Sequence, residues 1–186
     1  MNTQNITTRV IKQVAVFGAF FALLCVVAGC AGTSQEVISS PEIQTASNPF
    51  SEIKFEPRRF ESTLFNVFYL EVVNKTSGEL EIDWNKTRYL YKGKPYGVFV
   101  FKDIDPKTIK ESIPPDLIAQ GETFTKVIFP LKLIARASRR EQSKRSLYPG
   151  PIPLGENGIS LVIRSKGKEI REKIVINLEE VEPEQK

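Results

Sequence analysis

The feature that most constrains the fold of this chain is a series of short segments in which apolar and polar residues alternate. The clearest pair spans residues 159–164 and 170–178, on either side of Gly167, and its second half places three apolar side chains on one face: Ile174, Ile176 and Leu178. Successive side chains point to opposite faces of a β-strand, so a strand with one buried face shows this alternation. The pattern predicts a β-hairpin near the end of the chain.

Similar segments recur upstream at short intervals. Residues 64–73 are apolar at both alternating positions, which is expected of a central strand buried by another layer. Further strands are expected at 53–55, 80–84, 89–91, 96–101 and 123–129. A tight turn is expected at Gly93, and Asp105-Pro106 could begin one short helical turn. About eight strands without a long amphipathic helix predict an all-β fold, an antiparallel immunoglobulin-like β-sandwich.

Two segments give this predicted fold a family likeness. Residues 74–84 (NKTSGELEIDW) hold an asparagine turn followed by an alternating strand, and residues 118–122 (IAQGE) hold a Gln-Gly-Glu turn. Together they resemble small immunoglobulin-like domains of bacterial envelope proteins over roughly two thirds of the mature domain. β-Turn chemistry alone can produce these residues, so the resemblance implies a fold and no activity.

The N-terminal segment has the three parts of a bacterial secretory leader. Arg9 and Lys12 supply positive charge, and residues 14–27 form an uncharged apolar run that ends in Val27-Ala28-Gly29-Cys30. The apolar run is shorter than the ~20 residues of a membrane-spanning helix, so a permanent transmembrane helix is the weaker interpretation. Residues 1–30 resemble a bacterial lipoprotein signal peptide with its lipobox. A chance cysteine after an ordinary signal peptide is the alternative.

This resemblance implies cleavage between Gly29 and Cys30 and lipid modification of Cys30. The modified cysteine of such lipoproteins carries a diacylglycerol and usually a third, palmitate-type acyl chain, and two or more chains make a stable membrane anchor. Ala31 stands where an aspartate would be the familiar signal for retention in the inner membrane. The expected location is the periplasmic face of a Gram-negative outer membrane, with the inner membrane as the less favoured alternative.

Composition predicts four regions along the chain. Residues 1–29 form the signal peptide, and residues 30–49 form the lipidated cysteine and a flexible linker that is rich in Ser, Thr, Gln and Pro. Such a linker would span on the order of 25 Å as a coil. The β-sandwich domain is expected over 50–180, with a basic insertion at 131–153, and residues 181–186 form an acidic tail.

The residue inventory argues against an enzyme. The chain contains no histidine, which is the commonest general base and zinc ligand. Its two cysteines are Cys25, which would leave with the signal peptide, and Cys30, which would be lipidated. Asp103 and Asp105 have the spacing that begins a calcium loop, but Pro106-Lys107 breaks the motif. We therefore expect no catalytic residues, cofactor or metal, and no nucleic-acid partner.

The best candidate for a functional surface is the basic insertion. Its positive charges oppose only Glu141, and they are Lys132, Arg136, Arg139, Arg140, Lys144 and Arg145. Leu131, Ile134, Ala135 and Ser138 fall at helical spacing, which predicts a short basic amphipathic helix. This surface could contact an acidic partner or anionic lipid headgroups. A solvated loop whose charge only aids solubility is the alternative.

The aromatic residues offer a second candidate surface. Trp84 shares its strand parity with Leu80 and Ile82, which places it in the core, whereas the exposure of Tyr89 and Tyr91 stays open. Taken together, the sequence predicts a lipid-anchored periplasmic accessory or scaffold module that acts by protein–protein contact. The alternatives are a small-ligand or ion-binding lipoprotein and an inhibitor-like module that presents the Pro-rich loop 149–153.

Overall fold

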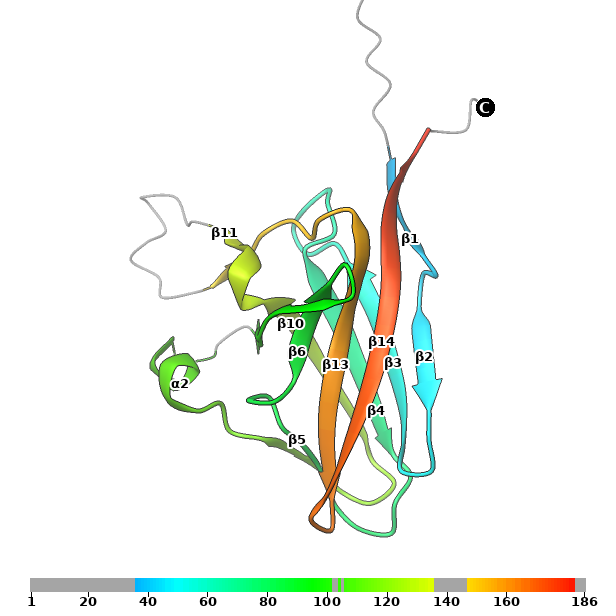
Figure 1. The fold of residues 1–186 in the computed structure, drawn as a ribbon, viewed down its shortest axis with the longest axis vertical. Coiled ribbons are helices and arrows are strands. Elements are labelled where there is room, and N and C mark those ends of the chain that lie inside the picture. The colour runs from blue at the N-terminus through cyan, green and yellow to red at the C-terminus, as the bar shows by residue number, and fades with distance from the viewer. Residues whose placement is uncertain (1–35, 102–103, 105, 136–146, 183–186) are drawn as a thin grey trace, which may run out of the picture. The chain divides into compact units, whose positions relative to one another are not determined.

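The computed structural model describes residues 36–101, 104, 106–135 and 147–182. Within them the chain forms two antiparallel sheets, and Figure 1 shows strands of the first lying in front of strands of the second. The first, seven-stranded sheet has the order β1 (Glu36–Ser40), β14 (Lys168–Val181), β13 (Gly155–Ser165), β5 (Leu80–Ile82) and β9 (Asp116–Ile118). Its other two strands are β6 (Arg88–Tyr91), which pairs with β13, and β7 (Lys94–Gly97), which pairs with β6.

The second sheet has five strands. Their order is β2 (Gln44–Ser47), β3 (Ser51–Arg58), β4 (Val67–Asn74), β10 (Thr123–Pro130) and β8 (Phe99–Phe101). A separate two-stranded ribbon pairs β11 (Ile134–Ala135) with β12 (Tyr148–Pro149). The described helical segments are α2 (Pro106–Glu111) and a 3₁₀ turn, η1 (Leu131–Leu133). The prediction of an all-β, antiparallel two-sheet fold is therefore confirmed.

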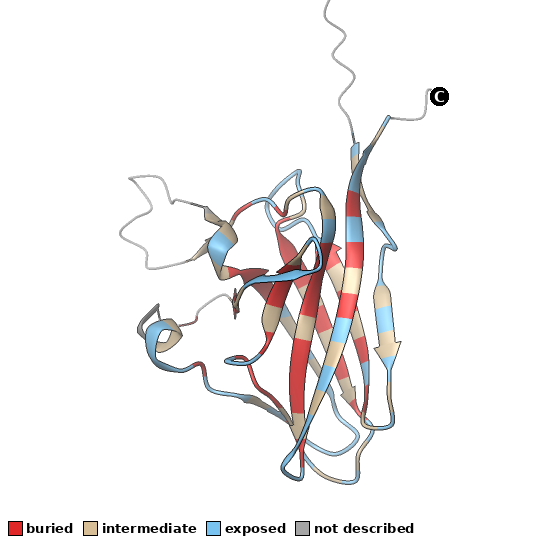
Figure 2. Cartoon of the chain, viewed as in Figure 1, coloured by how far each residue is buried: buried red, intermediate tan, exposed pale blue. Residues whose placement is uncertain are grey.

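The core lies where alternating side chains of the two sheets meet. On β3 every second residue is buried, and on β14 the predicted face of Ile174, Ile176 and Leu178 is buried too, as the red bands of Figure 2 show. The Phe55 and Phe68 rings stack at 4.5 Å between centroids, and the Phe99 ring packs edge-on against both. Offset-stacked and edge-on pairs suit the ring quadrupoles, so this cluster joins β3, β4 and β8.

The two predicted hairpins form with the expected turns. Lys166 and Gly167 connect β13 to β14 with φ of 49° and 78°, and Lys92 and Gly93 connect β6 to β7 with φ of 50° and 74°. Two consecutive left-handed residues match the twist of the paired strands. The second arm of the upstream hairpin, however, is divided. β7 stays in the first sheet, whereas β8 crosses to the second sheet and pairs with β10.

The prediction of a flexible linker over residues 30–49 is wrong for residues 36–47. This segment forms β1, which pairs along the end of β14, and β2, which pairs along β3. Both are edge strands, whose hydrogen bonds come from the backbone and whose outer sides face water, so few apolar side chains are needed. The folded domain consequently begins at Glu36 and not at residue 50, and β14 extends to Val181, where the acidic tail was expected.

The predicted basic helix is also wrong where it is described. Leu131–Leu133 form a single 3₁₀ turn, and the chain then extends as β11. The Gly150 amide donates a hydrogen bond of 2.7 Å to the Leu133 carbonyl, so pairing with β12 takes the backbone groups that a helix would use. Pairing with a distant segment overrides the helical spacing. Fourteen strands are described where about eight are expected, because β1, β2, β9, β11 and β12 are short strands without a sequence signal and because β7 and β8 replace the single strand expected at 96–101.

Candidate functional site

A short loop between β3 and β4 forms the first wall of the candidate site. Its ends are closed by a hydrogen bond of 3.1 Å from the Asn66 amide to the Arg58 carbonyl. The buried Asn66 side chain accepts a hydrogen bond from the Phe60 amide and donates one to the Phe60 carbonyl, both at 2.8 Å. The Ser62 hydroxyl accepts a hydrogen bond of 3.0 Å from the Leu64 amide. These contacts hold the loop over residues 59–66 in one conformation.

The neck of the basic insertion forms the second wall. It is the β11–β12 ribbon, in which Ile134 pairs with Pro149 and Ala135 pairs with Tyr148. Ile152, which is buried, donates its amide to the Phe65 carbonyl at 2.8 Å. The neck is therefore attached to the loop 59–66. The same contact packs the Pro-rich loop 149–153 against the domain. A loop that acts as an inhibitor would instead project from the domain.

Between these walls lies a hollow of about 610 Å³, which we call the neck groove. Its floor is formed by Val67 of β4 and by Val127 and Phe129 of β10, and its sides are residues 60–62 and 147–149. Val127 is 39% exposed although it lies on a strand, and Phe60 is 41% exposed. Glu61, Ser62 and Asn66 also line the hollow, but most of its lining is apolar, which suits an aromatic or aliphatic group of a ligand or a partner.

The predicted basic surface is only partly described. Lys132 lies on η1, and its ammonium is 4.6 Å from the centre of the Tyr96 ring of β7. Lys132 is not among the lining residues of the neck groove. The other basic residues of the predicted surface lie outside the described residues: Arg136, Arg139, Arg140, Lys144 and Arg145. Gly29 and Cys30, the predicted cleavage and lipidation sites, also lie outside them.

The aromatic residues are mostly core. Trp84 is buried, as predicted, and its indole donates a hydrogen bond of 2.7 Å to Asp116. Tyr89 is also fully buried and its hydroxyl contacts the Asn157 side chain, so burial raises the pKa of the Tyr89 hydroxyl. Tyr91 is half-buried, with its hydroxyl 3.3 Å from the Leu154 carbonyl oxygen. The Tyr89 and Tyr91 side chains thus form no open aromatic face.

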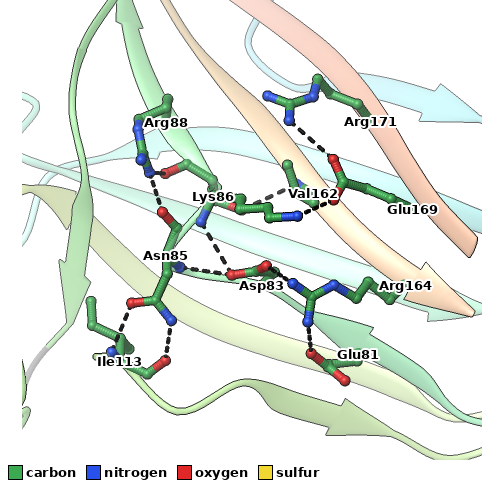
Figure 3. Close-up of polar contacts among 11 residues, drawn as sticks. Glu81, Asp83, Asn85, Lys86, Arg88, Ile113, Val162, Arg164, Glu169 and Arg171 are labelled. Carbon is green, nitrogen blue, oxygen red and sulfur yellow. Dashed lines mark hydrogen bonds and ion pairs between the residues drawn. The ribbon is translucent and has the colours of Figure 1, made fainter. Parts of the chain in front are cut away.

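A network of charged side chains covers part of the first sheet (Figure 3). Arg164 bridges Glu81, at 2.7 Å, and Asp83, whose carboxylate also accepts the backbone amides of Asn85 and Lys86 at 3.0 and 3.1 Å. Alongside, Glu169 accepts hydrogen bonds from Lys86 and Arg171, and they lower the pKa of its carboxyl group. These groups neutralise one another across neighbouring strands, so we interpret the network as structural.

A second, smaller hollow of about 400 Å³ lies between β1 and the end of β3. Arg59 crosses it, because its guanidinium donates a hydrogen bond of 2.6 Å to the Val37 carbonyl and lies 4.3 Å from the centre of the Phe65 ring. The loop 59–66 therefore touches the start of β1 on one side and borders the neck groove on the other.

Among the described residues, no three His, Cys, Asp or Glu side chains are placed to hold a metal ion. No helix in the same part of the chain is both long and apolar enough to cross a membrane.

Comparison of the chain with protein-family models, with curated proteins and with solved structures finds no match in any of the three. The neck groove and the chemistry of the chain are therefore the features from which a function can be inferred. Sequence reasoning identified the insertion but not the groove. In the sequence, the groove residues Val67, Val127 and Phe129 have the pattern of ordinary strand positions. The hollow exists only because the fold brings them beside residues 147–149.

Proposed function

We propose that this protein is a lipid-anchored accessory module of a Gram-negative envelope that binds a protein partner on the periplasmic side of the outer membrane. The anchor is Cys30, acylated after cleavage behind Gly29, and the partner site is the neck groove together with the basic insertion. The groove is the observation that carries this proposal. A hollow of about 610 Å³ with exposed apolar side chains suits the apolar anchor of a partner, and the segment of sequence between its lining residues Phe129 and Leu147 carries the basic residues of the insertion.

The same proposal includes an immunoglobulin-like arrangement of the two sheets. Its support is the antiparallel pairing throughout, the transfer of the chain between sheets at β1 to β2 and at β7 to β8, and the contact between the two segments of the family likeness. Asn74 of the first segment donates its side-chain amide to the Ala119 carbonyl of the second at 3.0 Å. An experimental structure with the strand order of another known β-sandwich class would replace this assignment.

Site-specific crosslinking in cells tests the partner site. A photo-reactive residue replaces Val127 in the groove floor, and the matched control replaces Thr123, which lies on the same face of β10 but outside the groove. We expect one protein adduct from position 127, weakened when Arg139 and Arg140 are changed to Gln, and none from position 123. Identical adducts from both positions would show that the groove selects no partner.

A small-ligand-binding lipoprotein is the second candidate function. The volume of the neck groove also falls within the range of ligand sites, roughly 300–1,000 Å³, and its floor of Val67, Val127 and Phe129 favours an apolar ligand over an ion. Native mass spectrometry of the protein released from membranes distinguishes the two functions. A bound small molecule that disappears in Val127→Asp would favour ligand binding.

A further inference from the structure

We infer that the loop 59–66 is a membrane-contact loop, which rests Phe60 and Leu64 on the lipid surface to which the domain is anchored. This inference rests on the proposed acylation of Cys30. It adds to that proposal the orientation of the domain and the surface that meets the bilayer. Three observations carry it: the length of the connecting chain, the position of the loop and its exposed apolar side chains.

The connecting chain is short because the domain begins earlier than the sequence suggests. Only five residues separate Cys30 from Glu36, the first residue of β1. Six peptide steps reach at most about 22 Å even when fully extended. β14, in contrast, runs through fourteen residues from Lys168 to Val181, which amounts to roughly 40 Å at about 3.3 Å per residue. Glu36 pairs with Val181, so the tether holds this end of the domain near the lipid.

The loop 59–66 lies at that same end. Arg59 donates its guanidinium to the Val37 carbonyl at 2.6 Å, one residue after the tether ends. The hollow between β1 and β3 is likewise lined by Glu36 from one side and by Phe65 from the other. Figure 1 shows the loop between β3 and β4 at the end of the domain where β1 begins and β14 finishes. The first residues to meet a surface at the end of the tether therefore include this loop.

The loop presents apolar side chains in a fixed position. Phe60 is 41% exposed and Leu64 is 43% exposed, although both are large and apolar. The backbone of Phe60 is fixed by both hydrogen bonds of the Asn66 side chain, and the Leu64 amide is bonded to the Ser62 hydroxyl. Little conformational freedom is lost when such a loop meets another phase. A bilayer interface is the occupant that suits it, because aromatic and aliphatic side chains transfer favourably to the headgroup–acyl boundary.

The far end of the domain provides the control. Ser77 is exposed in the turn after β4, and its hydroxyl lies 3.3 Å from the ammonium of Lys166, in the turn that begins β14. If the loop 59–66 rests on the membrane, Ser77 lies about the length of β14 away from it. The chain has only the cysteines Cys25 and Cys30, so a cysteine placed at 64 or 77 is the single free thiol of the acylated protein.

The experiment attaches an environment-sensitive fluorophore to Leu64→Cys or to Ser77→Cys in the full-length protein. Each labelled protein is purified with its acyl chains and reconstituted in vesicles of phosphatidylethanolamine and phosphatidylglycerol with brominated acyl chains. We expect emission from position 64 to be blue-shifted and quenched several-fold more than emission from position 77. Phe60→Ser in the Leu64→Cys protein should reduce the quenching, because one of the two contacts is lost.

Mass spectrometry of the Cys30 peptide separates the possible failures. If Cys30 is acylated and the two labels are quenched equally, the contact loop is refuted while the anchor stands. Equal quenching at 64 with and without Phe60→Ser would refute contact by the apolar pair. An unmodified Cys30 would overturn both the anchor and the orientation that depends on it.

Discussion

Asn74 offers the most decisive test of how the fold is held together. It ends β4, is 1% exposed, and its side-chain amide donates to three carbonyls, those of Gly78 at 2.7 Å, Ile118 at 2.9 Å and Ala119 at 3.0 Å. Its side-chain oxygen accepts the amide and the hydroxyl of Thr76, both at 2.8 Å. One side chain thus joins the turn after β4 to the turn that precedes β10.

The expected cost of Asn74→Ala follows from these contacts. Each intramolecular hydrogen bond contributes about 0.5–1.5 kcal/mol net, and each buried group left without a partner costs about 1–3 kcal/mol. The amide nitrogen has two hydrogens for its three carbonyls and the Thr76 hydroxyl also contacts the Gly78 carbonyl, so about three full bonds are lost, and we expect a loss of about 3 kcal/mol in the free energy of unfolding. For a domain of this size the midpoint of thermal unfolding should fall by roughly 10 °C.

Urea denaturation of the chain from Ala31 onward measures this loss, with Trp84 as the fluorescent probe. Asn74→Ala should change stability and not the surface exposed on unfolding. The urea concentration at the midpoint should therefore fall, while the slope of the unfolding free energy against urea concentration stays constant. Asn177→Ala is the matched control, since the Asn177 side chain is exposed and its hydrogen bond to Glu179 is long, at 3.5 Å. A cost below about 1 kcal/mol for Asn74→Ala, typical of a minor substitution, would refute the view that this side chain joins the two turns.

Three further predictions concern other contacts. Gly158→Ala should destabilise the domain by about 2 kcal/mol or more, because a Cβ there would lie 2.4 Å from the Ile174 carbonyl oxygen; unchanged urea denaturation would contradict this close approach. Burial raises the pKa of the Tyr89 hydroxyl, so the unfolded state loses this proton at a lower pH than the folded state and the free energy of unfolding falls above about pH 10. In Tyr89→Phe this fall should be smaller than in the original protein. Parallel stability curves of the two proteins from neutral to alkaline pH would be evidence against this. The hydrogen bond from Lys86 is the main cause of the lowered pKa of the Glu169 carboxyl group, so Lys86→Ala should raise that pKa. An unchanged NMR titration of Glu169 would disprove that pairing.

Much of the fold could be predicted because the signals are local. The alternation on β14 and the turns at Gly93 and Gly167 involve neighbours in the chain, and each has the predicted structure. The burial of Trp84 also followed from its parity with Leu80 and Ile82. Such features depend on side-chain direction and turn conformation, which the sequence encodes within a few residues.

The candidate site could be predicted only in part. The length and charge of the insertion indicated a special surface, but the helix expected near Ile134 gave way to β11 because Pro149 and its neighbours supply a strand partner. The neck groove had no sequence signal, since Val67 and Val127 lie sixty residues apart and meet a third distant segment. Pairing between distant segments depends on the whole fold.

The amino-acid sequence by itself determined the all-β class, the two hairpins and the buried positions of Trp84 and of the face with Ile174, Ile176 and Leu178, because these follow from alternation and turn chemistry between neighbours. Only the tertiary structure decided that polar residues 36–47 are strands, that β8 leaves its hairpin for the second sheet, and that Asn74 binds the turn at Ala119. The physical reason is that an edge strand or a buried amide is stabilised by hydrogen-bonding partners far away in the chain. Those partners reach their positions only when both sheets have formed.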